Sequence, residues 1–205
     1  EWVRLEARGQ APSPADVACQ TIGHAPPVGL CGSAVLDAVA QLRKHGVLAP
    51  TGNMQAGSHP RLRGEGKDAS FILVPAGEQG ATRDIVLTRK DVNEIQLAKA
   101  AIRAGVEILL LEAGLEADRV EQVFVVGAFG TYLDVGSALD VGMFPPLPRK
   151  GFVQAGNAAG IGAKRVLLSR RSREHAARIA RGISYVELTI HPRFVESYTQ
   201  ALMLP

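Results

Sequence analysis

The hydrophobic and polar positions of this chain predict an alternation of strands and helices. The clearest helix is expected from residue 90 to about 113, where apolar residues recur at steps of three and four positions. Thr88 and Asp91 stand before it with the spacing of a capping box, and Gly114 follows it. This segment is the longest helix that the sequence predicts.

The other expected elements are shorter and are bounded by glycine and proline residues. Helices are expected over residues 33–44, 137–141, 158–168, 169–181 and from Pro192 onward. Strands are expected over residues 2–7, 17–22, 71–74, 85–87, 120–126, 151–154 and 184–189, with a proline-bearing turn at 11–14. Residues 51–68 lack periodicity and are expected to form a mobile loop. The alternation of strands and helices predicts the α/β class.

Composition narrows the possible classes of protein. The chain has 205 residues, 46% of them apolar and 21% charged, as expected for one soluble globular domain. Its longest apolar run, over residues 106–111, is interrupted by Glu107 and is too short to cross a bilayer. The chain begins without an initiator methionine or a charged-then-apolar leader, and we expect it to be the downstream part of a longer protein. A cytoplasmic location without a membrane partner is also expected.

Basic residues gather near the end of the chain. The formal charge is +3, and residues 164–181 hold seven Lys and Arg residues against Glu174 alone. A solvated helix face is the simplest interpretation, and an acidic protein partner is the alternative. Nucleic acid is not expected, because no aromatic residues lie between the cations to stack on bases.

Two glycine-rich turns follow predicted strands and are candidates for a nucleotide site. They contain Gly127, Ala128, Phe129 and Gly130 in the first turn, and Gly156, Asn157, Gly160 and Gly162 in the second. Small residues at the end of a strand let a ligand approach the backbone, and the following helix offers N–H donors. The second turn matches neither the Walker nor the Rossmann pattern. Alternatively, the glycines have no role in binding and simply allow a helix to pack closely on a strand.

A third candidate is the loop that precedes the first predicted helix. Gly32 and Ser33 could line a ligand with backbone N–H groups, with the Ser33 hydroxyl donating to a phosphate or ribose, or Ser33 could simply cap the helix. Cys31 and Cys19 are twelve residues apart and no Cys-x-x-Cys pair exists, so no metal site is expected. No catalytic constellation was found, and Asp37, Asp134 and Asp140 are interpreted as solvated or capping acids.

The long predicted helix carries two cations in unusual places. Lys99 lies within the apolar stripe and Arg103 lies at its edge. Lys99 could extend past the core to reach water, or it could reach a ligand where the helix meets the sheet.

Four stretches resemble the C-terminal part of the reductive activators of corrinoid proteins. These are residues 29–40, 87–105, 125–133 and 156–164. That family belongs to the superfamily of actin, sugar kinases and heat-shock chaperones (ASKHA). The resemblance covers essentially the whole chain, although Ala34 stands where many relatives have glycine.

The resemblance implies a ribonuclease-H-like half of an actin-type ATPase, with a mixed sheet flanked by helices and with upstream strands missing. Residues 1–205 would form this half, with 47–84 as an inserted loop and strand region. Gly127–Gly130 resemble the adenosine motif, and Lys99 and Arg103 would lie beside the adenine. ATP or ADP with Mg²⁺ is the implied cofactor, with most phosphate and magnesium ligands outside this chain. The family's [2Fe–2S] cluster would lie only in the parent protein.

The implied function is an ATP-dependent activation that returns a corrinoid protein from Co(II) to Co(I). The partner would be a corrinoid protein or methyltransferase, and a homodimer is left open. Two alternatives remain: a related iron–sulfur protein that acts on another metalloenzyme or methyltransferase, and a stand-alone interaction domain without catalysis. The isolated chain is expected neither to hydrolyse ATP nor to transfer electrons.

Overall fold

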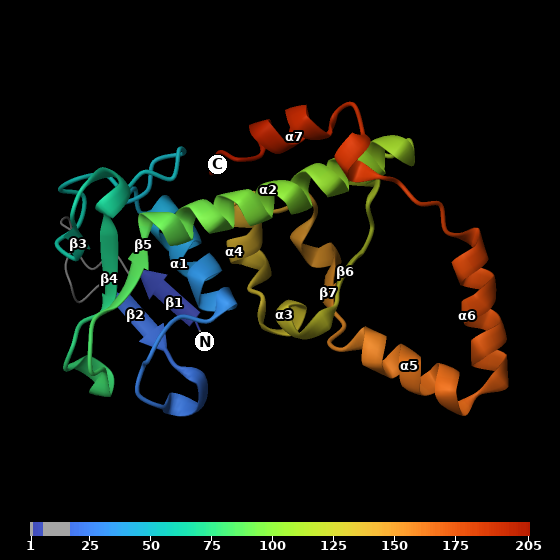
Figure 1. The fold of residues 1–205 in the computed structure, drawn as a ribbon, viewed down its shortest axis with the longest axis horizontal. Coiled ribbons are helices and arrows are strands. Elements are labelled where there is room, and N and C mark those ends of the chain that lie inside the picture. The colour runs from blue at the N-terminus through green and yellow to red at the C-terminus, as the bar shows by residue number, and fades with distance from the viewer. Residues whose placement is uncertain (1, 6–16) are drawn as a thin grey trace.

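Helices and small sheets alternate along the chain in the computed structural model, which describes residues 2–5 and 17–205 (Figure 1). The strands are β1 (Trp2–Leu5), β2 (Val17–Gln20), β3 (Leu62–Arg63), β4 (Ser70–Val74), β5 (Ile85–Thr88), β6 (Val123–Val125) and β7 (Phe152–Gln154). The helices are α1 (Gly32–Lys44), α2 (Arg89–Glu112), α3 (Gly127–Tyr132), α4 (Val135–Asp140), α5 (Ala158–Leu168), α6 (Arg170–Gly182) and α7 (Phe194–Gln200). The predicted α/β class is confirmed. The proline-bearing turn predicted at 11–14 lies outside the described residues.

The described strands form three small sheets that contain both strand orientations. β1 and β2 are antiparallel, and β4 lies between β3 and β5 with antiparallel pairing on both sides. β6 and β7 are parallel, with Val123 opposite Phe152. Because parallel strands end at the same edge of a sheet, the chain leaves β6 and β7 on the same side.

The main hydrophobic core lies between α1, the β3–β4–β5 sheet and the first half of α2. Phe71 in β4 and Leu36 and Leu42 in α1 are fully buried in it. The apolar positions of α1 recur at helical spacing, so one face of this helix contacts β1 and the core while Lys44 at its end is exposed.

The helix α2 confirms the strongest prediction from sequence. The Thr88 hydroxyl accepts a hydrogen bond from the Asp91 N–H, and the Asp91 carboxylate accepts one from the Thr88 N–H. This capping box satisfies two N–H groups that the first turn of a helix leaves without partners. The second half of α2 extends beyond the core and packs against α7 (Figure 1).

Two expectations about element boundaries were wrong. Ser33 does not cap α1, because the helix begins one residue earlier and Cys31 occupies the N-cap position. No strand forms over residues 184–189 in the described chain. That segment instead ends in a short 3-10 helix (Leu188–Ile190), where a Leu188 methyl group lies 3.3 Å from the position of a Cβ built on Gly105 of α2. The segment packs against a helix rather than beside a strand edge.

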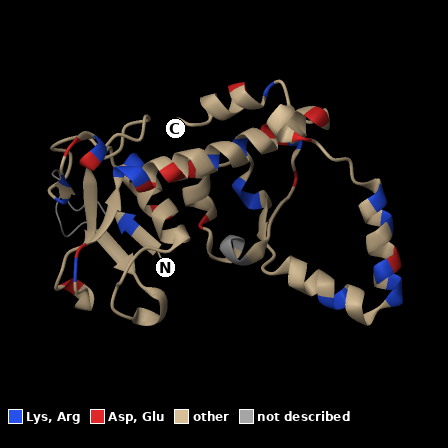
Figure 2. Cartoon of the chain, in the orientation of Figure 1, with Lys and Arg blue, Asp and Glu red and all other residues tan. Residues whose placement is uncertain are grey.

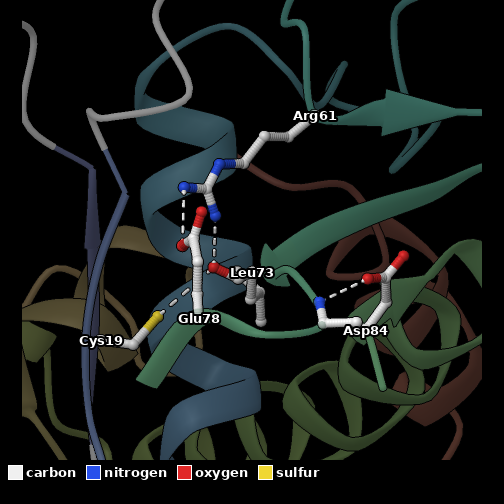
Figure 3. Close-up of polar contacts among 6 residues, drawn as sticks. Cys19, Arg61, Leu73, Glu78 and Asp84 are labelled. Atoms are coloured by element: carbon white, nitrogen blue, oxygen red, sulfur yellow. Dashed lines mark hydrogen bonds and ion pairs between the residues drawn. The ribbon is translucent and has the colours of Figure 1, made fainter. Parts of the chain in front are cut away.

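The region predicted as a mobile loop contains ordered structure. β3 pairs with β4, and Arg61, within this region, is buried (Figure 3). The Arg61 guanidinium donates to the Leu73 carbonyl at 2.7 Å and lies 3.7 Å from the Glu78 carboxylate. Cys19 contacts the same carbonyl, and burial raises the pKa of its thiol although the Arg61 charge opposes the rise. The prediction failed because these partners are distant in sequence.

Helices α5 and α6 form an arm that extends away from the rest of the described chain (Figure 1). Figure 2 shows Lys and Arg residues along α6, with Glu174 paired to Arg170. Leu167 and Leu168 at the end of α5 are about three-quarters exposed. None of the described helices has the length and apolar character needed to cross a membrane.

Candidate functional site

The two predicted glycine turns meet at the ends of β6 and β7. Gly127 begins α3 directly after β6, and Gly156 follows β7. The Gly127 N–H donates to the Gly156 carbonyl at 2.7 Å, and the Ala155 N–H donates to the Val125 carbonyl at 2.9 Å. The parallel pairing therefore continues past the strands and joins the two turns into one corner of backbone, which we call the glycine corner (Gly127 and Gly156).

The backbone at the glycine corner requires glycine and leaves open space beside it. Gly127 has φ +93° and Gly156 has φ +57°, values that side chains rarely allow. No described atom lies within 4 Å of a Cβ built on Gly127, and only the Thr131 hydroxyl, at 3.9 Å, approaches one built on Gly156. Close packing of helix on strand therefore does not explain these two glycines.

The other glycines of the second turn differ in role. Asn157 caps α5, since its side-chain oxygen accepts a hydrogen bond from the Gly160 N–H at 2.9 Å. A Cβ at Gly160 would lie 2.7 Å from the Asn157 amide, so the cap itself requires glycine there. Gly162 faces open space farther along α5. Ala128, Phe129 and Gly130 follow Gly127 within α3.

A cleft of about 1070 Å³ lies near the glycine corner, although neither Gly127 nor Gly156 lines it; the link is Thr131, which lines the cleft and donates from its hydroxyl to the Gly127 carbonyl. The walls of the cleft come from β1, one face of α1, the end of α3, and α4. Residues that line it include Arg4, Gly32, Ser33, Thr131, Asp134 and Gln154. The structure thus brings the predicted Gly32–Ser33 loop to one cleft with Thr131, the residue after the first glycine turn, whereas Gly156, Asn157, Gly160 and Gly162 of the second turn do not line it.

The N-terminus of α1 opens into this cleft. No side-chain hydrogen bond from Cys31 caps the helix, and the Cys31 thiol lies 3.3 Å from the Ser33 hydroxyl. The first N–H groups of a helix have no partner within the helix and carry partial positive charge. The N-terminus of α1, with Gly32 in the cleft wall, therefore offers positive electrostatic potential to whatever binds in the cleft.

Lys99 and Arg103 lie away from this cleft. Lys99 is only 1% exposed, and its ammonium donates to the Met203 carbonyl. Burial, aided by the nearby Arg103 charge, lowers the pKa of Lys99 to about 8. The interpretation that Lys99 reaches water was wrong, because its nitrogen binds a carbonyl inside the protein. Arg103 donates to the Phe144 carbonyl at 2.8 Å and pairs with Glu107. Their contact with adenine stays a prediction.

Sequence reasoning missed most residues of the cleft, and Asp37 is the one among them that is a buried acid. Asp37 was interpreted as a solvated or capping acid, but it is 5% exposed and lines the cleft from α1. The signal was present, because Asp37 interrupts the otherwise apolar run of residues 34–40. Asp134 does cap a helix, as expected, with its carboxylate accepting from the Ser137 N–H at 2.6 Å.

The described residues do not fit an iron–sulfur cluster. A [2Fe–2S] cluster of the plant type takes four cysteine thiolates, and the chain has two cysteines in total. Within residues 2–5 and 17–205, no group of three or more His, Cys, Asp or Glu side chains is placed to hold a metal ion.

The fold and the cleft define a domain of the ASKHA class. Residues 5–205 match the family model described as the C-terminal domain of RACo, the ASKHA domain. The chain therefore belongs to the family of C-terminal ASKHA domains found in reductive activators of corrinoid proteins.

Individual relatives agree with this membership. A protein named corrinoid activation enzyme RamQ, from Eubacterium limosum, is 37% identical over 190 residues, which cover 89% of this chain and 32% of the relative. A reductase of Co(II) methylated amine-specific corrinoid protein, from Methanosarcina barkeri, is 29% identical over 157 residues, which cover 77% of this chain and 25% of the relative.

A solved structure is also similar over the whole chain. It is described as a reductive activator for corrinoid, iron-sulfur protein, and it matches with a TM-score of 0.87 and 32% identity. The match covers 100% of this chain and 32% of that structure. This chain therefore spans a quarter to a third of the length of these three proteins.

Proposed function

We propose that this chain is the adenosine-binding portion of an ATP-dependent activator that returns corrinoid proteins from Co(II) to Co(I). The observation that carries the proposal is the glycine corner, where Gly127 and Gly156 join two parallel strand ends and Thr131 connects them to a cleft of about 1070 Å³. Backbone that is free of side chains at such an edge suits the close approach of a nucleotide. The predicted nucleotide residues Gly32 and Ser33 line the same cleft.

The relatives support the activity and its partner. One is named for corrinoid activation, and another for reduction of a Co(II) corrinoid protein. Reduction of Co(II) to Co(I) takes one electron, which in this proposal comes from an iron–sulfur cluster held elsewhere in the full-length protein. The partner is a corrinoid protein or methyltransferase, and the activator works in the cytoplasm.

The role of the nucleotide follows from linkage. A nucleotide that binds two arrangements of a protein with unequal affinity shifts their populations. If the corrinoid partner also prefers one arrangement, each ligand changes the affinity of the other by the same factor. This chain contributes the adenosine side of that coupling, and the phosphate and magnesium ligands come mostly from outside it.

The proposal is tested by calorimetric titration of ATP and ADP into the full-length protein and its Gly127→Ala variant. The variant should bind at least tenfold more weakly, because a side chain at φ +93° forces the corner to shift. Gly114→Ala is the matched control: it also has positive φ and open space, but it ends α2 away from the cleft. Unchanged affinity in Gly127→Ala, or an equal loss in both variants, would contradict the proposed site. The isolated chain should bind more weakly than the full-length protein.

A further inference from the structure

Asp37 is a buried carboxyl group whose hydrogen bonds are incomplete. It lies in α1, one turn after Ser33, and it is 5% exposed while lining the cleft. Its Oδ1 atom has no hydrogen-bond partner among the residues that the structure describes. A buried acceptor without a partner costs free energy, and because Asp37 lines the cleft, a donor carried by a bound ligand could offset that cost once the carboxyl turns toward it.

The surrounding residues supply only some of the hydrogen bonds that the Asp37 carboxyl group can accept. Burial raises the pKa of Asp37, a hydrogen bond from Ser137 opposes the rise, and the negative charge of Asp134 adds to it. Ser137 is itself buried and lies in α4, so it holds the carboxyl between α1 and α4. The group is thus positioned by the fold with one oxygen still unsatisfied.

The charges around Asp37 restrict the ligand group that can reach it. The N-terminus of α1 and the nearby Arg4 disfavour a bare cation. Asp134 and Asp37 together disfavour a bare anion such as a phosphate oxygen. A neutral hydroxyl avoids both penalties, since its oxygen accepts from a helix N–H and its proton is donated to the carboxylate.

The geometry of the helix allows one ligand to meet both groups. Side chains of a helix lean toward its N-terminus, so Asp37 extends toward the turn that contains Gly32 and Ser33. That turn offers backbone N–H donors and lines the same cleft. Two neighbouring hydroxyl groups would therefore find acceptor and donor partners within about one helical turn, which rises ~5.4 Å.

We propose that Asp37 binds the ribose of the nucleotide, with Oδ1 accepting a hydrogen bond from a ribose hydroxyl while the α1 N-terminus donates to the hydroxyl oxygens. This inference rests on the proposed nucleotide site and adds to it the residue that selects a sugar with free hydroxyls. A nucleotide that lacks both hydroxyls keeps the phosphates and the base but loses this contact.

The test is calorimetric titration of ADP and 2′,3′-dideoxy-ADP into the full-length protein and its Asp37→Ala variant, which removes both acceptor oxygens. The unaltered protein should prefer ADP by about tenfold or more, as expected for hydrogen bonds to a charged group. The variant should bind both nucleotides alike, at the level of the dideoxy compound. The matched control is the exposed Asp118→Ala, which removes the same group outside the cleft and should keep the preference.

Each other outcome counts against one proposal in particular. If the unaltered protein binds both compounds equally well, the ribose assignment is wrong and the nucleotide site stands; this comparison needs no variant to fold. If Asp37→Ala retains the preference, or weakens both compounds equally, Asp37 does not contact the ribose. If neither compound binds the unaltered protein, the proposed nucleotide site fails and the ribose assignment fails with it.

Discussion

Lys99 is among the largest fully buried side chains in the described part of the chain, although it carries an ammonium group. Its nitrogen donates to the Met203 carbonyl, and Gln96, one turn earlier in α2, donates to the Leu202 carbonyl at 2.9 Å. Removal from water lowers the pKa of Lys99 to about 8, so the charged form is less stable in the folded than in the unfolded chain.

Replacing Lys99 with Met should therefore change how stability depends on pH. Below pH 8 the lysine is charged in both states, and its burial costs the folded state the full penalty. Between about pH 8 and 10.5 the folded state loses the proton first, so the unfolded state binds more protons and the free energy of unfolding rises with pH.

Between pH 7 and 10.5, the free energy of unfolding of the natural chain should therefore rise by about 3 kcal/mol relative to that of Lys99→Met. Urea unfolding at both pH values measures it, and the exposed Lys90→Met controls for the loss of a lysine. A difference that does not vary with pH would show that Lys99 is not destabilised by burial.

Among the helices, α2 and α6 have the same kind of N-cap but different tertiary support. Thr88 caps α2, which packs against the core and α7, whereas Ser169 caps α6, which lies in the exposed arm with α5. An N-cap contributes to global stability only if the helix it begins unfolds together with the core.

Thr88→Ala should lower the free energy of unfolding by about 1 kcal/mol, because the capping box is lost. Ser169→Ala should increase hydrogen exchange in α6 and leave the global transition nearly unchanged. Urea unfolding followed by circular dichroism, together with amide exchange, distinguishes the two effects. Equal loss of global stability in both variants would show that the α5–α6 arm unfolds with the core.

Across the whole molecule, the end of the chain joins parts that are far apart in sequence. The Leu204 N–H donates to the Pro50 carbonyl at 2.8 Å, and the Leu204 side chain is 1% exposed. With Gln96 and Lys99 bound to the two preceding carbonyls, residues 202–204 connect α2 to the loop after α1 (Figure 1).

Leu204→Ala should destabilise the protein by about 2–5 kcal/mol, because it removes a buried side chain and leaves a cavity. Met203→Ala is the matched control, since Met203 is the adjacent residue and is 48% exposed, and it should cost far less. Thermal or urea unfolding compares them. Similar losses in the two variants would mean that residues 202–204 are not anchored through Leu204.

Local patterns in the sequence were enough for most of the helices and for the glycine corner. The range 158–168 was predicted without error, and α2 begins one residue before its expected start, because spacing and caps act within a few residues. The two glycine turns were also predicted from sequence, because a backbone with positive φ favours glycine and the apolar residues of the preceding strand are adjacent to it in the chain.

Tertiary structure alone decided which groups meet. Lys99 and Met203 are 104 residues apart, and no periodicity in the chain indicates that one binds the other. Arg61, predicted to lie in a mobile loop, is buried on Leu73, and Asp37 becomes an unsatisfied acid only because α1 packs against α4. The sequence by itself determined the elements and their backbone corners, whereas burial and charge partners depend on packing between distant segments, which local spacing does not encode.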